Sequence, residues 1–214
     1  ATWEASSNIN ILGIVNSTSI AGGLNQSFGN FNYNCKDQDA IDFGLGVSII
    51  AKGNFEVSNT GLGSLHFKNS TSALILNVNG VFMMKEGSFI VNSGTSGATT
   101  LNFGALEISD GVFDLSTGGG TVTLTINGDY KQTGGVFTQT SAIASNCKFG
   151  GVESSFLITG GTYNNATLSY EVISSVVLTL NSNIITAASK TFLINPGATL
   201  ILGDGTLASA ATSG

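Results

Sequence analysis

The sequence contains no arginine, a single histidine (His66) and a single proline (Pro196). Charged residues make up only 9% of its 214 residues, against about 25% in an ordinary soluble domain. Arginine commonly binds phosphates and carboxylates, and histidine is the commonest acid–base residue near neutral pH. Because both are scarce, we expect a protein that is not an enzyme and that holds no cofactor.

Positive charge and long apolar runs are scarce as well. The sequence contains seven lysines and thirteen acidic residues, and its formal net charge is −6. This balance argues against a nucleic-acid partner, because such partners require a basic surface. No apolar run reaches the roughly 18 residues of a membrane-spanning helix, since the longest candidate, 172–188, is interrupted by Ser, Thr and Asn. Direct membrane insertion is therefore not expected.

Glycine, by contrast, is abundant, with 29 residues placed at a regular spacing. In each of two series a bulky apolar residue follows two positions after a glycine. The first series is Gly29-Asn30-Phe31, Gly53-Asn54-Phe55, Gly80-Val81-Phe82, Gly104-Ala105-Leu106 and Gly128-Asp129-Tyr130. The second is Gly63-Ser64-Leu65, Gly87-Ser88-Phe89, Gly111-Val112-Phe113, Gly135-Val136-Phe137 and Gly161-Thr162-Tyr163. Apart from one step of 27 and one of 26, every step is 24 residues.

Between these glycines the sequence alternates polar and apolar residues, as in 121–126, 74–78 and 176–181. Such alternation is typical of β-strands, and no segment shows the spacing of an amphipathic helix. A strand-and-turn unit that recurs at a fixed period indicates stacked coils. We therefore predict an all-β, right-handed parallel β-helix over 1–214, with about 24 residues per coil and roughly nine coils. The alternative is an antiparallel sandwich or barrel, which requires no fixed period.

The predicted coil assigns a role to both members of each glycine–apolar pair. The glycine allows a bend with positive φ, and the apolar residue two positions later points into the core. Phe113 is expected to stack between Phe89 and Phe137, with Leu65 below them. Asp114, Lys131 and Glu107 are expected on the surface.

Several segments resemble the repeats of very large secreted surface proteins of Bacteroidota. They are "GGLNQSFGNFNYNC" (22–35), "QTGGVF" (132–137) and "FLINPGATLILGDG" (192–205), and the resemblance extends over about 9–205. Those proteins are typically exported by the type IX secretion system, and their repeats look like adhesin or stalk segments, including those of gliding-motility adhesins. The resemblance implies an extracellular, cell-surface location. The chain lacks the sorting domain and binding module of a complete member.

The sequence offers one weak candidate for a metal site. Asp37, Asp39 and Asp42 lie close together in "CKDQDAID", and carboxylates at such spacing can share a hard cation such as Ca²⁺. A solvated loop explains the same residues, because the segment lacks the glycine–aspartate repeat of calcium-binding β-rolls. His66 has no second His or Cys ligand near it in the sequence and is expected to be a surface residue.

A β-helix can also be a carbohydrate-active enzyme, which needs two or three carboxylates on one face. At a period of 24, Glu86 over Asp110 is the only stacked acidic pair we find around the Gly111 corner, and Asp129 lies one coil before Glu153. A groove lined by three or more carboxylates or lysines would favour the enzyme. Thr-x-Thr ladders can bind ice or sugars, but "TVTLT" occurs only once.

The function predicted from the sequence is that of a non-enzymatic adhesin or stalk, one segment of a longer surface protein. Its polar Ser, Thr and Asn faces are expected to contact polysaccharide or other surface ligands. Neither 8–15 nor 198–212 resembles a solenoid cap, so further segments or neighbouring subunits are expected at both ends. Cys35 and Cys147 are 112 residues apart, too many coils for a disulfide, and each is expected to be a buried thiol.

Overall fold

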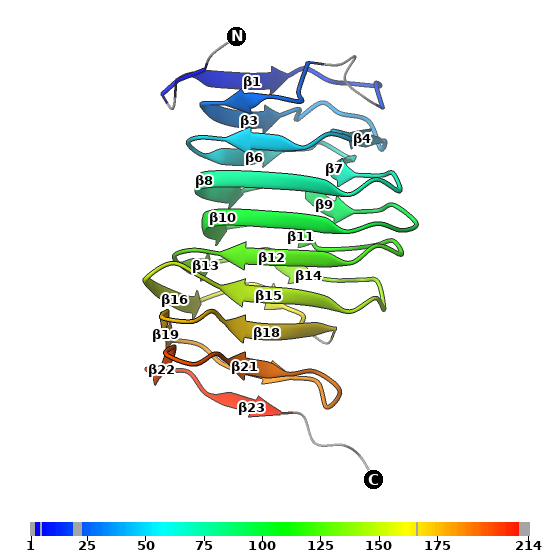
Figure 1. Cartoon of the computed structure of the whole chain (residues 1–214). Helices are drawn as coiled ribbons and strands as arrows, with labels where there is room; N and C mark the ends of the chain where they lie inside the picture. Colours follow the sequence, from blue (N-terminus) through cyan, green and yellow to red (C-terminus); the bar gives the residue numbers. More distant parts are fainter. Residues whose placement is uncertain (1–2, 5, 19–22, 166, 210–214) are drawn as a thin grey trace.

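The computed structural model describes residues 3–4, 6–18, 23–165 and 167–209. Throughout this part of the chain the regular elements are 23 β-strands, and no helix is present. The strands stack in parallel, about 24 residues apart, as a β-solenoid of about eight turns (Figure 1). In Figure 1 the front strands run from right to left, and the chain then passes behind them as it descends, which is a right-handed coil. The predicted fold class is confirmed.

Each coil contributes strands to three walls of the solenoid, named here the front, back and side sheets. The front sheet contains β2 (Ser27–Phe28), β5 (Ile49–Ala51), the first halves of β8 (Leu74–Met84) and β10 (Thr99–Ile108), β12 (Val122–Ile126), β15 (Ser145–Phe149), β18 (Leu168–Val172) and β21 (Phe192–Ile194). The back sheet contains β1 (Asn8–Leu12), β3 (Asn30–Asn34), β6 (Phe55–Asn59), the second halves of β8 and β10, β13 (Tyr130–Gln132), β16 (Glu153–Ile158), β19 (Val177–Leu180) and β22 (Thr199–Leu202).

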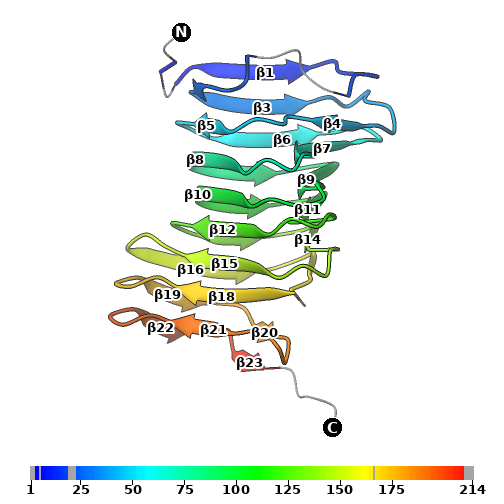
Figure 2. The same ribbon diagram turned by 45° about the vertical axis from the view of Figure 1, so that its right-hand side comes forward.

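The side sheet contains β4 (Asp42–Gly44), β7 (Ser64–Lys68), β9 (Ser88–Asn92), β11 (Val112–Asp114), β14 (Val136–Thr138) and β17 (Thr162–Tyr163), and a separate pair follows, β20 (Ile184–Thr186) with β23 (Leu207–Ser209). Figure 2 shows β4, β7, β9, β11 and β14 stacked along one side of the rod. The long strands β8 and β10 turn the corner between the front and back sheets without a break.

Both glycine–apolar series lie in the positions that the period predicts. The second series lies in the side sheet, where Leu65, Phe89, Phe113 and Phe137 are successive register partners. The first series lies in the back sheet, where Phe31 pairs with Phe55 and each later member pairs with the next. Every apolar residue of the two series is buried except Tyr163, which is half-buried.

The inward side chains form a continuous aromatic core. Phe55 and Phe82 stack with ring centroids 5.2 Å apart, and Phe113 and Phe137 stack at 5.8 Å. Rings also meet across the core, as Phe82 and Phe113 do edge to face at 5.2 Å. Such pairs add to the free energy gained from burying apolar area. The predicted position of Phe113 between Phe89 and Phe137 is confirmed.

The glycines of the two series have different physical roles. Gly111 and Gly135, which precede side-sheet strands, have φ of 71° and 61°, a conformation that costs little only for glycine. Gly104, in the back sheet, has no positive φ. There, a Cβ atom would lie 2.3 Å from the backbone oxygen of Asn79 in the preceding coil. The positive-φ explanation therefore holds for the second series except Gly63, and close packing of coils explains Gly104 in the first.

Candidate functional site

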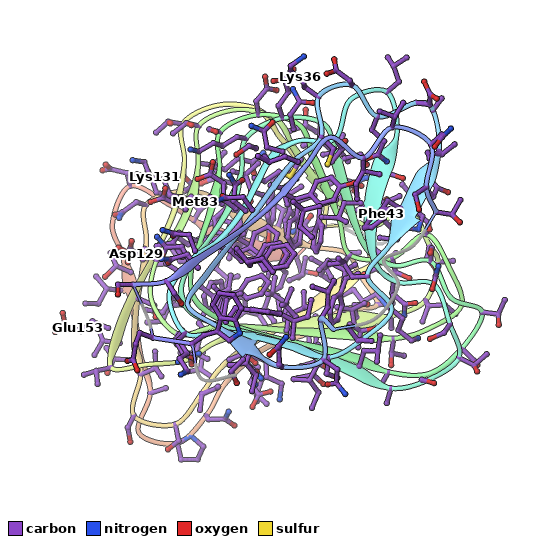
Figure 3. The ribbon with its side chains drawn as sticks, turned by 90° about the horizontal axis from the view of Figure 1, so that it is seen from above. Lys36, Phe43, Met83, Asp129, Lys131 and Glu153 are labelled. Carbon is purple, nitrogen blue, oxygen red and sulfur yellow. The ribbon has the colours of Figure 1, made fainter. Side chains whose placement is uncertain are left out.

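The outer surface of the back sheet is hollowed and carries polar and charged side chains. One outward row runs through seven coils in register and contains Asn10, Asn32, Glu56, Met83, Glu107, Lys131 and Leu157. Viewed down the rod, Met83, Asp129, Lys131 and Glu153 lie along the same side of the solenoid (Figure 3). Three hollows follow one another down this sheet and are called the upper, middle and lower hollows.

The upper hollow is lined by asparagines from successive coils. Asn30 donates a hydrogen bond to Asn8 Oδ1 at 3.0 Å, and Asn32 donates one to Asn10 Oδ1 at 3.3 Å. Asn54 lines the same hollow and accepts the backbone N–H of Val81 at 2.9 Å. Each amide carries two donor hydrogens and two acceptor lone pairs. A ladder bond therefore leaves hydrogen-bonding capacity directed toward solvent.

The middle hollow contains charged groups of both signs around Met83. Lys85, Glu107 and Lys131 line it, and Lys85 forms an ion pair with Glu56 at 2.9 Å. Glu107 and Lys131 are register partners on adjacent strands, and both are exposed. Three charged side chains, Lys85, Glu107 and Lys131, therefore line one groove, and such a groove favours an enzyme.

The lower hollow contains Asp129 and Glu153 together with Ser155 and Thr179. Asp129 Oδ1 accepts hydrogen bonds from the backbone N–H of Ser155 at 3.0 Å and from its hydroxyl at 2.8 Å. The predicted alignment of Asp129 with Glu153 was wrong by two residues. The register shifts because a two-residue insertion lengthens this coil, so that Tyr130 pairs with Phe156.

Among the described residues, Phe31 is the one aromatic residue that lines these hollows, and it is buried. All eighteen aromatic side chains of the chain are buried or half-buried. Proteins that bind sugars or bases through flat apolar surfaces expose aromatic rings for stacking. The groups that the back sheet offers for contact are therefore hydrogen-bonding and charged groups.

The structure does not bring the three candidate metal-binding aspartates together. Asp37 is exposed and pairs with Lys36 at 2.8 Å. Asp42 instead contacts side-sheet residues, accepting a hydrogen bond from the Ser64 hydroxyl. Within the described ranges, no group of three His, Cys, Asp or Glu side chains is arranged to hold a metal ion.

The expectation that His66 is a surface residue was wrong. Its side chain is on the outer side of the side sheet, yet the residue is only 6% exposed. Nε2 lies 2.8 Å from the Ser64 hydroxyl and 3.3 Å from Asp42 Oδ1, and Nδ1 lies 2.7 Å from the Ser93 hydroxyl. Ser93 and Asp42 contact different ring nitrogens, but in the reverse of the catalytic triad, in which the serine contacts Nε2 and the aspartate contacts Nδ1. Burial lowers the pKa of His66, and Asp42 partly opposes this shift.

Asp114 was also expected on the surface and is instead 4% exposed. Its carboxylate accepts the Thr140 hydroxyl at 2.8 Å and the backbone N–H of Ser116 at 2.9 Å. Burial raises the pKa of Asp114, while these hydrogen bonds lower it by less. Sequence alternation could have placed both His66 and Asp114 on the outer side of the sheet, but it carries no signal for what covers that side.

Cys35 and Cys147 are both free thiols and both buried, as predicted. Burial raises the pKa of Cys147 to about 12. Because thiolates are the reactive form of cysteine, this thiol is unreactive at neutral pH. It therefore fills space in the core.

No helix in the described part of the chain is long and apolar enough to cross a membrane. Comparisons with protein-family models, with curated proteins and with solved structures found no match to this chain. The site must therefore be interpreted from its geometry.

Proposed function

We propose that this chain is a non-enzymatic adhesin or stalk segment of an extracellular, cell-surface protein. The observation that carries the proposal is the combination of a continuous aromatic core with outward rows that include stacked polar side chains, such as Asn10 and Asn32 on the back sheet and Thr100, Thr123 and Asn146 on the front sheet. Repeated coils whose inner rings stack on one another give a stiff rod. The resemblance to Bacteroidota surface repeats adds export by the type IX system to this proposal.

We place the adhesive surface on the back sheet and propose a polar polysaccharide as its ligand. Sugar hydroxyl groups both donate and accept hydrogen bonds, as do the stacked amides of Asn8, Asn10, Asn30 and Asn32. The coils repeat about every 4.8 Å, so a chain molecule lying along the rod meets a further outward side chain of this row at each coil. Many weak contacts made by one rigid surface combine into useful avidity.

A retention assay tests the proposed surface. The purified chain is immobilised, and binding of a panel of neutral and acidic polysaccharides is measured for the double variant Asn10→Ala/Asn32→Ala. The matched control is Asn77→Ala/Asn102→Ala, because Asn102 donates to Asn77 at 2.8 Å in a similar stacked pair on the front sheet. We expect at least a tenfold loss of retention for the back-sheet variant alone. Equal losses for both variants would contradict this location, and no retention by the unaltered chain would leave the stalk role only.

A second candidate function is that of a β-helical carbohydrate-active enzyme, and the middle hollow favours it. Glu107 and Lys131 are adjacent there, with Lys85 close by. An acidic and a basic group next to a bound sugar can move a proton between them. Incubation with the same polysaccharides, followed by assays for new reducing ends and unsaturated products, tests this function. Turnover that Lys131→Ala and Glu107→Gln both abolish would replace the adhesin proposal.

We also propose that a further coil covers the last one. Leu202 and Ile194 are on the inner side, as register partners of the buried Leu180 and Val172, yet they are 57% and 42% exposed. Apolar side chains and strand edges at the end of a solenoid are covered when another coil stacks on them. Either a further segment of the same polypeptide or a neighbouring subunit would do so. Light scattering on the isolated chain should show end-to-end association, and a stable monomer at high concentration would contradict the idea.

A further inference from the structure

Lys68, the last residue of β7, is completely buried. Its Nζ donates hydrogen bonds to the backbone oxygens of Ser96 at 2.6 Å and Gly97 at 3.2 Å. No carboxylate in the described part of the chain forms an ion pair with it. Burial lowers the pKa of Lys68, because removing water disfavours the charged form of an amine. A lysine in such surroundings is shifted toward the neutral, nucleophilic amine.

Three oxygen acceptors surround Nζ. The backbone oxygens of Ser96 and Gly97 accept the two shorter hydrogen bonds, and Asn92 Oδ1 accepts the longest, at 3.4 Å. The amine can therefore lose the hydrogen directed at Asn92 and keep both of its shorter hydrogen bonds. Lys68 and Asn92 are register partners on the adjacent strands β7 and β9. The two side chains are therefore held side by side by the sheet itself.

The amide of Asn92 is placed as an electrophile. It is also completely buried, and its Oδ1 accepts the backbone N–H of Gly94 at 3.0 Å. A fixed donor at this oxygen stabilises the negative charge that develops when a nucleophile attacks the carbonyl carbon. The other amide atom, Nδ2, has no hydrogen-bond partner in the described structure. Its departure would therefore break no hydrogen bond and would relieve an unfavourable buried donor.

We propose that Lys68 and Asn92 form an intramolecular isopeptide bond that links two neighbouring coils. Lys68 Nζ attacks Asn92 Cγ, and a new N–C bond forms. The Cγ–Nδ2 bond breaks, and the proton lost from Nζ leaves with Nδ2 as ammonia. No oxidant or other reactant is needed, because one amine and one amide give one substituted amide and one ammonia.

This inference is independent of the proposed function. The bond would join β7 to β9 across the side sheet and prevent the two coils from separating there. The buried carboxyl group of Asp114 contacts Ser116 and Thr140, and no described carboxyl group contacts Lys68 or Asn92. The proton therefore passes from one nitrogen to the other without a carboxylic acid as carrier, and the reaction is expected to be slow.

Mass spectrometry of the unaltered, folded chain tests the proposal directly. After warm incubation to constant mass, the intact chain should be lighter by one ammonia. Peptide mapping should show a branched peptide that joins Lys68 to Asn92, with no tryptic cleavage after Lys68. Succinimide formation at Asn79-Gly80 or Asn127-Gly128 also releases ammonia. The branched peptide therefore distinguishes the proposed bond from this side reaction. Full mass, or ammonia loss without that peptide, overturns the proposal.

Two variants give an independent measure. Lys68→Met removes the nucleophile and should abolish the branched peptide. Lys85→Met, a matched change of an exposed lysine on the back sheet, should leave it unchanged. The reaction requires the native fold, so a chain kept in denaturant should also form no branched peptide. Branched peptide formed equally in denaturant would contradict the role assigned to the buried site.

Discussion

The outer sides of the back and side sheets differ in burial although their sequences alternate in the same way. On the back sheet, Glu107 and Lys131 project into open hollows and are exposed. On the side sheet, His66 and Asp114 project outward from the same kind of strand but are 6% and 4% exposed. Both sheets follow the two-residue period of a β-strand. The difference therefore arises from what covers each sheet.

The segments that follow the side-sheet strands supply this cover. Ser93 contacts His66, Ser96 contacts Lys68, and Thr140 contacts Asp114, and each of these partners lies just after a side-sheet strand. Buried polar groups must be hydrogen-bonded, or their desolvation is costly. The side sheet therefore uses its polar groups for stability, whereas those of the back sheet remain available for contact with other molecules.

The largest loss of stability is expected from a substitution in the core, on the inner side of the side sheet. Phe113 contacts the rings of Phe82, Phe89, Phe103 and Phe137. Phe113→Ala removes these contacts and leaves a cavity, which should lower the free energy of unfolding by about 3–5 kcal/mol. Denaturant unfolding followed by circular dichroism measures the change. A loss below that of any polar substitution would show that the aromatic core does not dominate stability.

The next largest effect is expected on the covered side sheet. Asp114→Ala removes the acceptor of the buried Ser116 N–H and leaves that donor without a partner, which should cost about 1–3 kcal/mol. The exposed Thr140 hydroxyl keeps the Ser116 backbone oxygen as an acceptor at 3.4 Å. Asp114→Asn keeps an acceptor and removes the charge, and it is expected to cost less. The same unfolding experiment measures both variants. If Asp114→Ala changed stability no more than Glu107→Ala on the back sheet, the contrast between the two sheets would be wrong.

The sequence predicted the fold and the core because both depend on periodicity. The steps of 24 residues from Leu65 to Phe137 correspond to successive register partners. Alternation also gave the correct side of the sheet for His66 and Asp114. It could not give their burial, because that depends on hydrogen bonds with connecting segments of the next coil. These contacts have no repeat in the sequence.

The candidate site was less predictable for a second reason. Two extra residues between Tyr130 and Phe156 change which residues are neighbours on the back sheet. Asp129 therefore contacts Ser155 and not the residue exactly one period away. Relative to the 24-residue period, the front strand of that coil is one residue early and its back strand is two residues late. Hollows that combine residues from three or four coils consequently require the actual register.

The pH dependence of stability tests the role of the buried His66 on the side sheet. Its pKa is lowered in the folded chain, so the unfolded chain, with a histidine pKa of about 6.5, binds more protons. Stability from His66 is therefore present above about pH 6.5 and is lost as the pH falls toward the lower folded pKa, at no more than about 1.4 kcal/mol per pH unit. Asp114, with its raised pKa, acts in the opposite direction. For this reason, melting temperatures of the unaltered chain are compared with those of His66→Gln, which should be less sensitive to pH between about 7 and 5.

The smallest effect is expected on the open back sheet. Lys131 and Glu107 are exposed and are not joined by an ion pair in the described structure, and exposed charges contribute little to folding. Lys131→Ala and Glu107→Ala should each change the free energy of unfolding by less than about 0.5 kcal/mol. Lys85→Ala is a useful comparison because it breaks the ion pair with Glu56. It should still lower the free energy of unfolding by less than about 1 kcal/mol. If unfolding showed a loss of several kcal/mol for Lys131→Ala, the middle hollow would be a structural element. A surface that tolerates these substitutions is free to serve binding.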